Sequence, residues 1–179
     1  MPSRWIVTAI GQDRPGIVAG VTKVLYQAGC NLEDSAMTRL EGEFAIMLIF
    51  SAGKTSGAQL AKAFQKAEKE LHLVVHLKPL TAQESAARKA VGATYQISVY
   101  GTDKPGIVYR LAEALAKLKV NILDVHTHRS AGKPYLYLTL LEAEAPLTLA
   151  AEALAGHLQR VAKQLGVEVH VRPAETEVL

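Results

Sequence analysis

The sequence lacks the features that mark several large classes of protein. It has a single cysteine, Cys30, so it can form neither an internal disulfide nor a cysteine-based zinc site, and a reducing compartment is expected. Its longest apolar run, Phe44–Phe50, is seven residues long, far below the roughly 20 residues that span a bilayer. The first twelve residues lack the basic segment and apolar stretch of a secretory signal. We therefore expect a cytoplasmic protein with no membrane segment.

A strong excess of charge of one sign is also missing. The 179 residues include 20 Lys and Arg against 17 Asp and Glu, a formal charge of +3, with a pI near 9.0. So small an excess is weak support for a nucleic-acid partner. The hydrophobic content of 49% is that of an ordinary globular protein.

An internal repeat is the strongest feature that is present. A shift of 90 residues aligns Gly11–Val18 with Gly101–Val108 without a gap. The matches continue at Leu25 and Leu115, Asn31 and Asn121, Asp34 and Asp124, Arg39 and Arg129, Gly42 and Gly132, and Leu48 and Leu138. This period is too long for a solenoid unit and suits two small domains. We predict one domain over residues 1–80, a second over 94–179, and a linker over 81–93, where large apolar residues are few.

The same order of elements is predicted in both repeats. Strands follow from β-branched and aromatic runs, and helices from apolar residues at helical spacing. For the first repeat we predict strand Arg4–Ile10, a helix that begins at the Asp13–Pro15 start signal and ends at Gly29, strands Asn31–Leu40 and Phe44–Phe50, helix Ala58–Leu71 and strand Leu73–Lys78. For the second we predict strand Thr94–Tyr100, helix Gly106–Leu118, strands Asn121–Arg129 and Tyr135–Leu141, helix Thr148–Leu165 and strand Val167–Arg172.

This order, βαββαβ, predicts an α+β protein of two tandem ferredoxin-like domains. Each domain would have a four-stranded antiparallel sheet with both helices on one face. Strand Phe44–Phe50 does not alternate between apolar and polar residues, which predicts that both of its faces are buried. Either the strand is central with some exposed apolar residues, or a second sheet from the other repeat or another chain covers the open face. We favour the covering sheet, because large apolar patches are rare on monomers.

The first strand-to-helix turn is the candidate binding site, because both repeats keep its Asp, Pro and Gly. Asp13 is expected to cap the helix, Pro15 to lie in its first turn, and Gly16 to allow close backbone approach. The free N–H groups of a helix N-terminus suit a carboxylate. Asn31, at the start of the next strand, offers an amide. Together these groups suit a zwitterion, although the same residues also make a good turn and helix start without any ligand.

These residues resemble a known family. Each repeat is similar to an ACT domain, a regulatory module whose Asp-x-Pro-Gly turn and Asn-Leu or Asn-Ile strand start form an amino-acid site at a domain interface. In the first half, Gly11–Val18, Gly29–Ser35 and Gly42–Phe44 resemble the glycine cleavage system transcriptional repressor family, which is itself a tandem ACT family. The resemblance implies a protein that responds to glycine and binds a transcription activator, with no DNA-binding motif of its own.

The resemblance extends to particular residues. The candidate ligand-binding residues are Asp13, Arg14, Pro15, Gly16, Ile17, Asn31 and Leu32 in the first repeat, and Asp103, Lys104, Gly106, Ile107, Asn121 and Ile122 in the second. The second repeat departs from the family, because Lys119 and Val120 replace Gly29 and Cys30, and Leu123 replaces Glu33. An equivalent second site is therefore in doubt.

Other side chains have plainer interpretations. His126 and His128 lie two residues apart on a predicted strand and could ligate a metal, but no third ligand is visible and a solvated pair is preferred. Cys30 is expected to behave as a small buried hydrophobe. The solvent-exposed face of the predicted helix Ala58–Leu71 is expected to carry Lys62, Lys66 and Lys69. No cofactor or metal ion is expected.

The sequence offers little support for two further classes of function. The RNA-recognition motif shares this order of elements and stacks bases on aromatics two apart, as Tyr135 and Tyr137 are, but the glycine-aromatic core of that motif is missing. No nucleophile elbow, Walker loop or Cys/His pair indicates an enzyme. Formyltetrahydrofolate deformylases also carry an N-terminal ACT domain but resemble the chain only there.

Our prediction is a non-enzymatic, amino-acid-responsive regulator. We expect it to bind a small amino acid, with glycine as first candidate, to form a homo-oligomer and to modulate a protein partner such as a transcription activator. Direct binding of nucleic acid or membrane is not expected. A scaffold that binds a partner without any ligand is the alternative.

Overall fold

The computed structural model describes residues 3–81, 84, 92–133 and 135–174. The chain divides into two compact units, residues 1–87 and 88–179. Most of the predicted linker, residues 82–83 and 85–91, lies outside the described residues, and the last two residues of that prediction, 92 and 93, belong to a strand.

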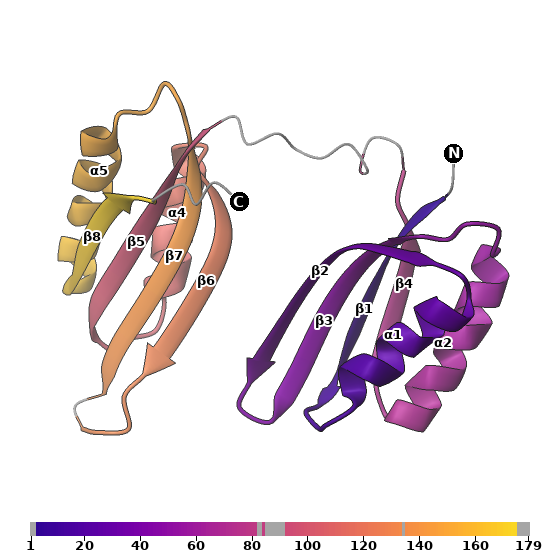
Figure 1. Ribbon diagram of the computed structural model, residues 1–179. Coiled ribbons are helices and arrows are strands. Elements are labelled where there is room, and N and C mark those ends of the chain that lie inside the picture. Colours follow the sequence, from indigo (N-terminus) through magenta and orange to yellow (C-terminus); the bar gives the residue numbers. More distant parts are fainter. Residues whose placement is uncertain (1–2, 82–83, 85–91, 134, 175–179) are drawn as a thin grey trace. The chain divides into compact units, whose positions relative to one another are not determined.

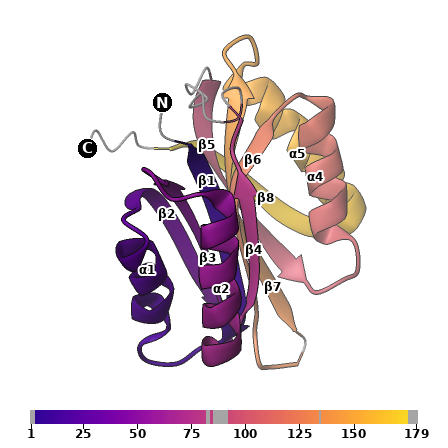
Figure 2. The same ribbon diagram turned by 90° about the vertical axis from the view of Figure 1, so that its right-hand side faces the viewer.

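The first unit has the predicted βαββαβ order (Figure 1). Its elements are β1 (Arg4–Gln12), α1 (Ile17–Gln27), β2 (Asn31–Leu40), β3 (Glu43–Ser51), α2 (Gly57–Leu71) and β4 (Val74–Pro79). The antiparallel sheet has the strand order β2-β3-β1-β4. Figures 1 and 2 show both helices on one face of this sheet.

The second unit repeats the first. Its elements are β5 (Gly92–Thr102), α4 (Ile107–Lys117), β6 (Asn121–Arg129), β7 (Leu136–Pro146), α5 (Ala151–Leu165) and β8 (Val167–Pro173). The sheet order β6-β7-β5-β8 matches that of the first unit. The prediction of two ferredoxin-like domains is confirmed.

Each unit has its own core between its sheet and its helices. In the first unit Val7, Phe44, Leu48, Phe50 and Leu60 are buried completely or nearly so. In the second unit Ile97, Leu111, Leu115, Leu154 and Leu158 are buried to the same degree. These side chains lie at the spacings that marked the strands and helices in the sequence, because alternate strand residues and every third or fourth helix residue share a face.

The ungapped repeat alignment is wrong for the residues after the β2–β3 hairpin and the equivalent β6–β7 hairpin. Val7 pairs with Leu48, and Ile97, which lies 90 residues after Val7, pairs with Leu141, which lies 93 residues after Leu48. Leu141, not Leu138, is therefore the counterpart of Leu48. The connection between β6 and β7 contains three extra residues, which a comparison without gaps does not detect.

Strand β7 is also longer than predicted and ends at Pro146. Its last residues before that proline alternate Glu and Ala, which have low strand propensity, but their pairing with β5 extends the strand. The chain then turns at Pro146, whose carbonyl accepts the N–H of Leu149 at 2.9 Å. Helix α5 consequently begins at Ala151, not at Thr148.

Strand β3 buries one face in the core of its own unit, and the covering of its other face by a second sheet stays a prediction. Phe44, Ile46, Leu48 and Phe50 point into the core, whereas Met47, on the other face, has 49% of its surface exposed. The apolar residues of the outer face therefore form an open sheet surface within the unit. No described helix is long and apolar enough to cross a membrane.

Candidate functional site

The turn that joins β1 to α1 exposes the N-terminus of that helix. Helix α1 begins at Ile17 after Gly16, whose backbone has a φ of 89°, and no side chain caps it. The predicted cap by Asp13 is thus wrong, and Pro15 precedes the helix instead of lying in its first turn. A Cβ on Gly16 would meet no other atom of the chain within 4 Å, so within the chain it is the left-handed backbone that requires glycine.

The second unit builds the same turn. Gly106 precedes α4 with a φ of 92°, and again no side chain caps the helix. In both units no side chain takes the first-turn N–H groups; the Ile17 N–H donates to Arg14 O at 3.3 Å, and the N–H groups that follow it in the first turn suit an anion. Ile17 and Ile107, the first residues of the two helices, are 3% and 1% exposed and belong to the cores. Their buried side chains anchor the start of each helix in its core, so only the backbone of these two residues can face a ligand.

The aspartate of each turn forms an ion pair with an arginine of an edge strand of its sheet, β2 or β6. Asp13 Oδ2 lies 3.2 Å from Arg39 Nη1, and Asp103 Oδ2 lies 3.6 Å from Arg129 Nη1. The Asp13 N–H also donates to Gly42 O at 2.8 Å, which ties the turn to the β2–β3 hairpin. The two arginines were not predicted as site residues, although they stand at equivalent positions of the repeat.

The basic residue of each turn points to the second helix of its unit. Arg14 Nη2 donates to Leu71 O at 2.7 Å, and Lys104 Nζ donates to Leu165 O at 3.3 Å. These are the last residues of α2 and α5, where a cation also meets the negative end of the helix dipole. These hydrogen bonds give Arg14 and Lys104 a structural role, because they connect each turn to the second helix of its unit.

The predicted asparagines lie at the opposite end of each sheet from the turns. Asn31 pairs with Ser51, which pairs with Arg4 at the start of β1, whereas Asp13 follows the end of β1. Eight residues of strand separate the two ends, a distance of about 26 Å at the usual rise. One small amino acid therefore cannot contact Asp13 and Asn31 of the same domain.

The second unit has the same separation, with Asn121 paired to Glu144 far from Asp103. Both edge strands have a bulge just after these asparagines, between Leu32 and Asp34 and between Ile122 and Asp124. Leu32 is 44% exposed, and Ile122 packs partly against the core. The structure thus separates the thirteen predicted residues into a turn group and a strand-start group.

The remaining sequence candidates have local partners. His126 Nε2 lies 2.9 Å from Asp124 Oδ2, and both side chains are exposed; no group of three potential metal ligands occurs among the described residues. Burial raises the pKa of the Cys30 thiol above its usual value. Lys66 pairs with Glu70 along α2 at 3.7 Å.

The tyrosines do not form a base-stacking platform. Tyr137 shares a face of β7 with the buried Leu141 and packs against the core, away from the open sheet face. Tyr135 precedes β7 and lies against the Arg129 guanidinium, 4.7 Å from the ring centre. Neither side chain offers the outward ring that stacking on the sheet requires.

Comparison with known proteins supports the interpretation of the chain as two domains in tandem. A family model described as the ACT domain matches residues 3–78 and again residues 93–172. The glycine cleavage system transcriptional repressor of Escherichia coli is 28% identical over 120 residues, which cover 67% of this chain and 62% of the repressor. The match therefore spans less than two thirds of that relative. A UPF0237 protein of Methanocaldococcus jannaschii is 41% identical over 75 residues, which cover 41% of this chain and 83% of that protein.

Two solved structures share the fold over nearly the whole chain. A protein of unknown function from Galdieria sulphuraria has a TM-score of 0.80 at 24% identity and is covered completely, with 98% of this chain aligned. A protein provisionally assigned as a glycine cleavage system transcriptional repressor has a TM-score of 0.76 at 18% identity, with 98% of this chain and 99% of that chain covered.

Proposed function

This chain belongs to the ACT domain family, and we propose that it is an amino-acid-responsive regulator that modulates a transcription-regulating protein. The match to a glycine cleavage system transcriptional repressor makes glycine the first candidate ligand. The proposal includes no catalytic step, since two ACT domains account for most of the chain. We expect it to act in the cytoplasm, where a transcription regulator would be found.

The observation that carries this proposal is the turn that occurs in both units. An uncapped helix N-terminus follows a turn that carries a carboxylate, Asp13 in the first unit and Asp103 in the second. The helix N–H groups suit the carboxylate of an amino acid, and the aspartate suits its ammonium group. Glycine fits such a site because recognition uses only its backbone-type groups.

We further propose that a complete site needs two different ACT domains. Strand β2 is exposed along its whole length, and an edge strand with unpaired backbone groups can pair with another strand. Antiparallel pairing of two such edges would bring the Asn31 end of one strand beside the Leu40 end of the other. The Leu40 end lies next to the hairpin that holds Asp13, so the turn of one domain would meet the asparagine of its partner.

The exposed residues beside this edge support the pairing. Leu32 and Met37 on β2 are 44% and 59% exposed, and Tyr26 on α1 is 84% exposed. Apolar side chains of this size beside an unpaired strand edge are typical of a surface that another domain covers. Pairing of this edge between two copies of the chain would give a homo-oligomer.

The alternative is a scaffold that binds its partner without a ligand. It is favoured by the ion pairs, because Arg39 and Arg129 already pair with the two aspartates and Arg14 and Lys104 already have carbonyl partners. Each charged side chain of the turn thus has an internal partner without a ligand.

Thermal unfolding and calorimetry with a panel of amino acids, glycine first, separate the two possibilities. A ligand that binds only the native state stabilises it by about 2.7 kcal/mol at one hundred times its Kd. D13N should remove the response, D103N tests the second turn, and E152Q on the exposed start of α5 is the control. If no amino acid at millimolar concentration shifts the transition, the sensor proposal fails and the scaffold remains.

A further inference from the structure

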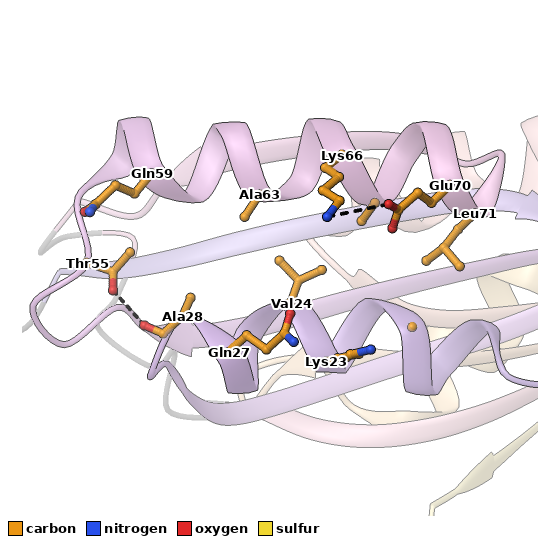
Figure 3. A pocket seen from close by; sticks show the side chains of 12 residues that line it. Lys23, Val24, Gln27, Ala28, Thr55, Gln59, Ala63, Lys66, Glu70 and Leu71 are labelled. Atoms are coloured by element: carbon orange, nitrogen blue, oxygen red, sulfur yellow. Dashed lines mark hydrogen bonds and ion pairs between the residues drawn. The ribbon is translucent and has the colours of Figure 1, made fainter.

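A groove separates α1 and α2 in the first unit. It has a cavity volume of about 580 Å³. Figure 3 shows the two helices running side by side, with Val24 and Ala63 directed into the space between them. One end is closed by a hydrogen bond of 2.6 Å from Thr55 Oγ1 to Ala28 O.

The groove exists because small residues face each other across the helix pair. Gly20 on α1 leaves no side chain above Leu71; a Cβ there would lie 2.8 Å from Leu71 Cδ1. Ala63 and Ala67 on α2 continue the same small lining. Apolar atoms thus form the floor, and the longer side chains of Lys23, Gln27 and Lys66 stand at the rim.

The second unit has no such set of small residues. Helices α1 and α4 both have 11 residues, and α2 and α5 both have 15. Position by position, Arg110 replaces Gly20 and His157 replaces Ala63. Arg160 Nη2 lies 3.4 Å from His157 Nδ1, so long side chains occupy the corresponding surface.

The charges of the two helix pairs differ as well. In the second unit Glu113 stands at the position of Lys23 and pairs with both Arg110 at 3.5 Å and Lys117 at 3.4 Å. In the first unit Lys66 pairs with Glu70, but Lys23 has no acidic partner among the residues that the structure describes. The groove therefore combines an apolar floor with an ammonium group free to pair with a carboxylate.

We propose that this groove docks an amphipathic helix of the regulated partner, one that presents apolar side chains a turn apart and an acidic residue toward Lys23. The groove runs along α1 from Gly20 to Ala28, about 12 Å at the helical rise, which is two turns of a bound helix. A helix laid in a groove between two helices is a common mode of recognition, and small floor residues allow close approach. This inference rests on the proposed function, since it names the surface for that protein partner.

The groove is also connected to the ligand turn. Arg14 in the turn holds the carbonyl of Leu71, and the Leu71 side chain closes the groove beside Gly20. A ligand that moves the turn would therefore act on one wall of the docking surface through a single residue.

A designed helical peptide tests the groove in the full-length protein. The probe is an alanine-based, end-capped 14-residue peptide with two leucines one turn apart and a glutamate on the same face; a second peptide carries lysine in place of the glutamate. Amide NMR spectra should show shifts centred on Gly20, Val24, Ala63 and Ala67. The glutamate peptide should bind at least about fivefold more tightly than the lysine peptide, as expected for an exposed charge pair.

Variants of the chain give the decisive comparison. K23E should weaken the glutamate peptide about fivefold, and A63H, which copies the second unit, should abolish binding while the melting temperature stays near that of the parent chain. G20R is a second way to fill the groove. The control K69E changes an exposed lysine of α2 outside the groove and should leave the affinity within twofold.

Absence of binding, equal binding of both peptides, or shifts centred elsewhere would overturn the docking proposal. The glycine response is measured on the same samples. A peptide that fails to bind while glycine still stabilises the chain removes the groove and leaves the sensor proposal intact, and a peptide that binds without any glycine response leaves the groove as the surface of a scaffold.

Discussion

Replacement of Gly16 by alanine tests whether the turn depends on a left-handed backbone. Gly16 has a φ of 89°, and a Cβ there would meet nothing within 4 Å. No clash therefore contributes, and the cost is that of an L-residue in the left-handed region, about 1–2 kcal/mol. At an m-value of roughly 1–1.5 kcal/mol per molar for a small domain, the urea midpoint should fall by about 1 M.

Tryptophan fluorescence can follow the first unit alone. Trp5 is the only tryptophan in the chain and packs against the first core. G16A should lower the midpoint of this signal, whereas G106A, the equivalent change in the second unit, should leave it unchanged. G42A is the matched control, since Gly42 has open space around it and no positive φ, and its effect should stay within about 0.5 kcal/mol.

The reasoning is refuted if G16A and G42A unfold at the same urea concentration. Such a result would mean that the turn relaxes to a right-handed backbone without cost. The uncapped helix N-terminus could then not be regarded as a fixed feature of the binding site.

Three further predictions concern other parts of the chain. S56A removes a capping box in which Ser56 and Gln59 bond each other's backbone N–H, and should destabilise the first unit by about 1 kcal/mol in the Trp5 urea assay. Lys78 and Thr81 hold the pKa of Glu84 at about 2, so its NMR titration should lie below that of an ordinary glutamate; the stabilisation is present above the unfolded pKa and is lost as the pH falls toward 2, and K78M should move the titration upward. Because burial raises the pKa of Cys30, the folded chain should react with a thiol reagent at pH 8 more slowly than the urea-unfolded chain; equal rates would contradict this.

The fold could be predicted because its signals are local. Apolar residues at strand and helix spacing mark every element, and the motif around Asp13 recurs 90 residues later with few changes. The errors fall where local signals are weak. The end of β7 is a Glu-Ala alternation that becomes a strand only by pairing with β5. The longer β6–β7 connection changes the offset between the two repeats from 90 to 93 residues, and no local motif marks the insertion.

The site was harder to predict because it depends on which residues meet. The sequence places Asp13 and Arg39 far apart and gives no reason to join them, whereas the hairpin register brings their side chains to 3.2 Å. The sequence also predicts that Asp13 and Asn31 share one site, because both flank α1. Helix α1 runs from one end of the sheet to the other, so Asp13 and Asn31 lie at opposite ends.

The sequence by itself determined two ACT domains, their order of elements, their cores and the turn that each of them repeats, since these follow from periodicity and short-range motifs. Only the tertiary structure decided that the turn is uncapped, that its charges pair with the edge strand and the second helix, and that Gly20 and Ala63 leave a groove where the second unit has Arg110 and His157. The physical reason is that contacts between elements depend on strand register and helix packing, which bring together residues that no local pattern connects.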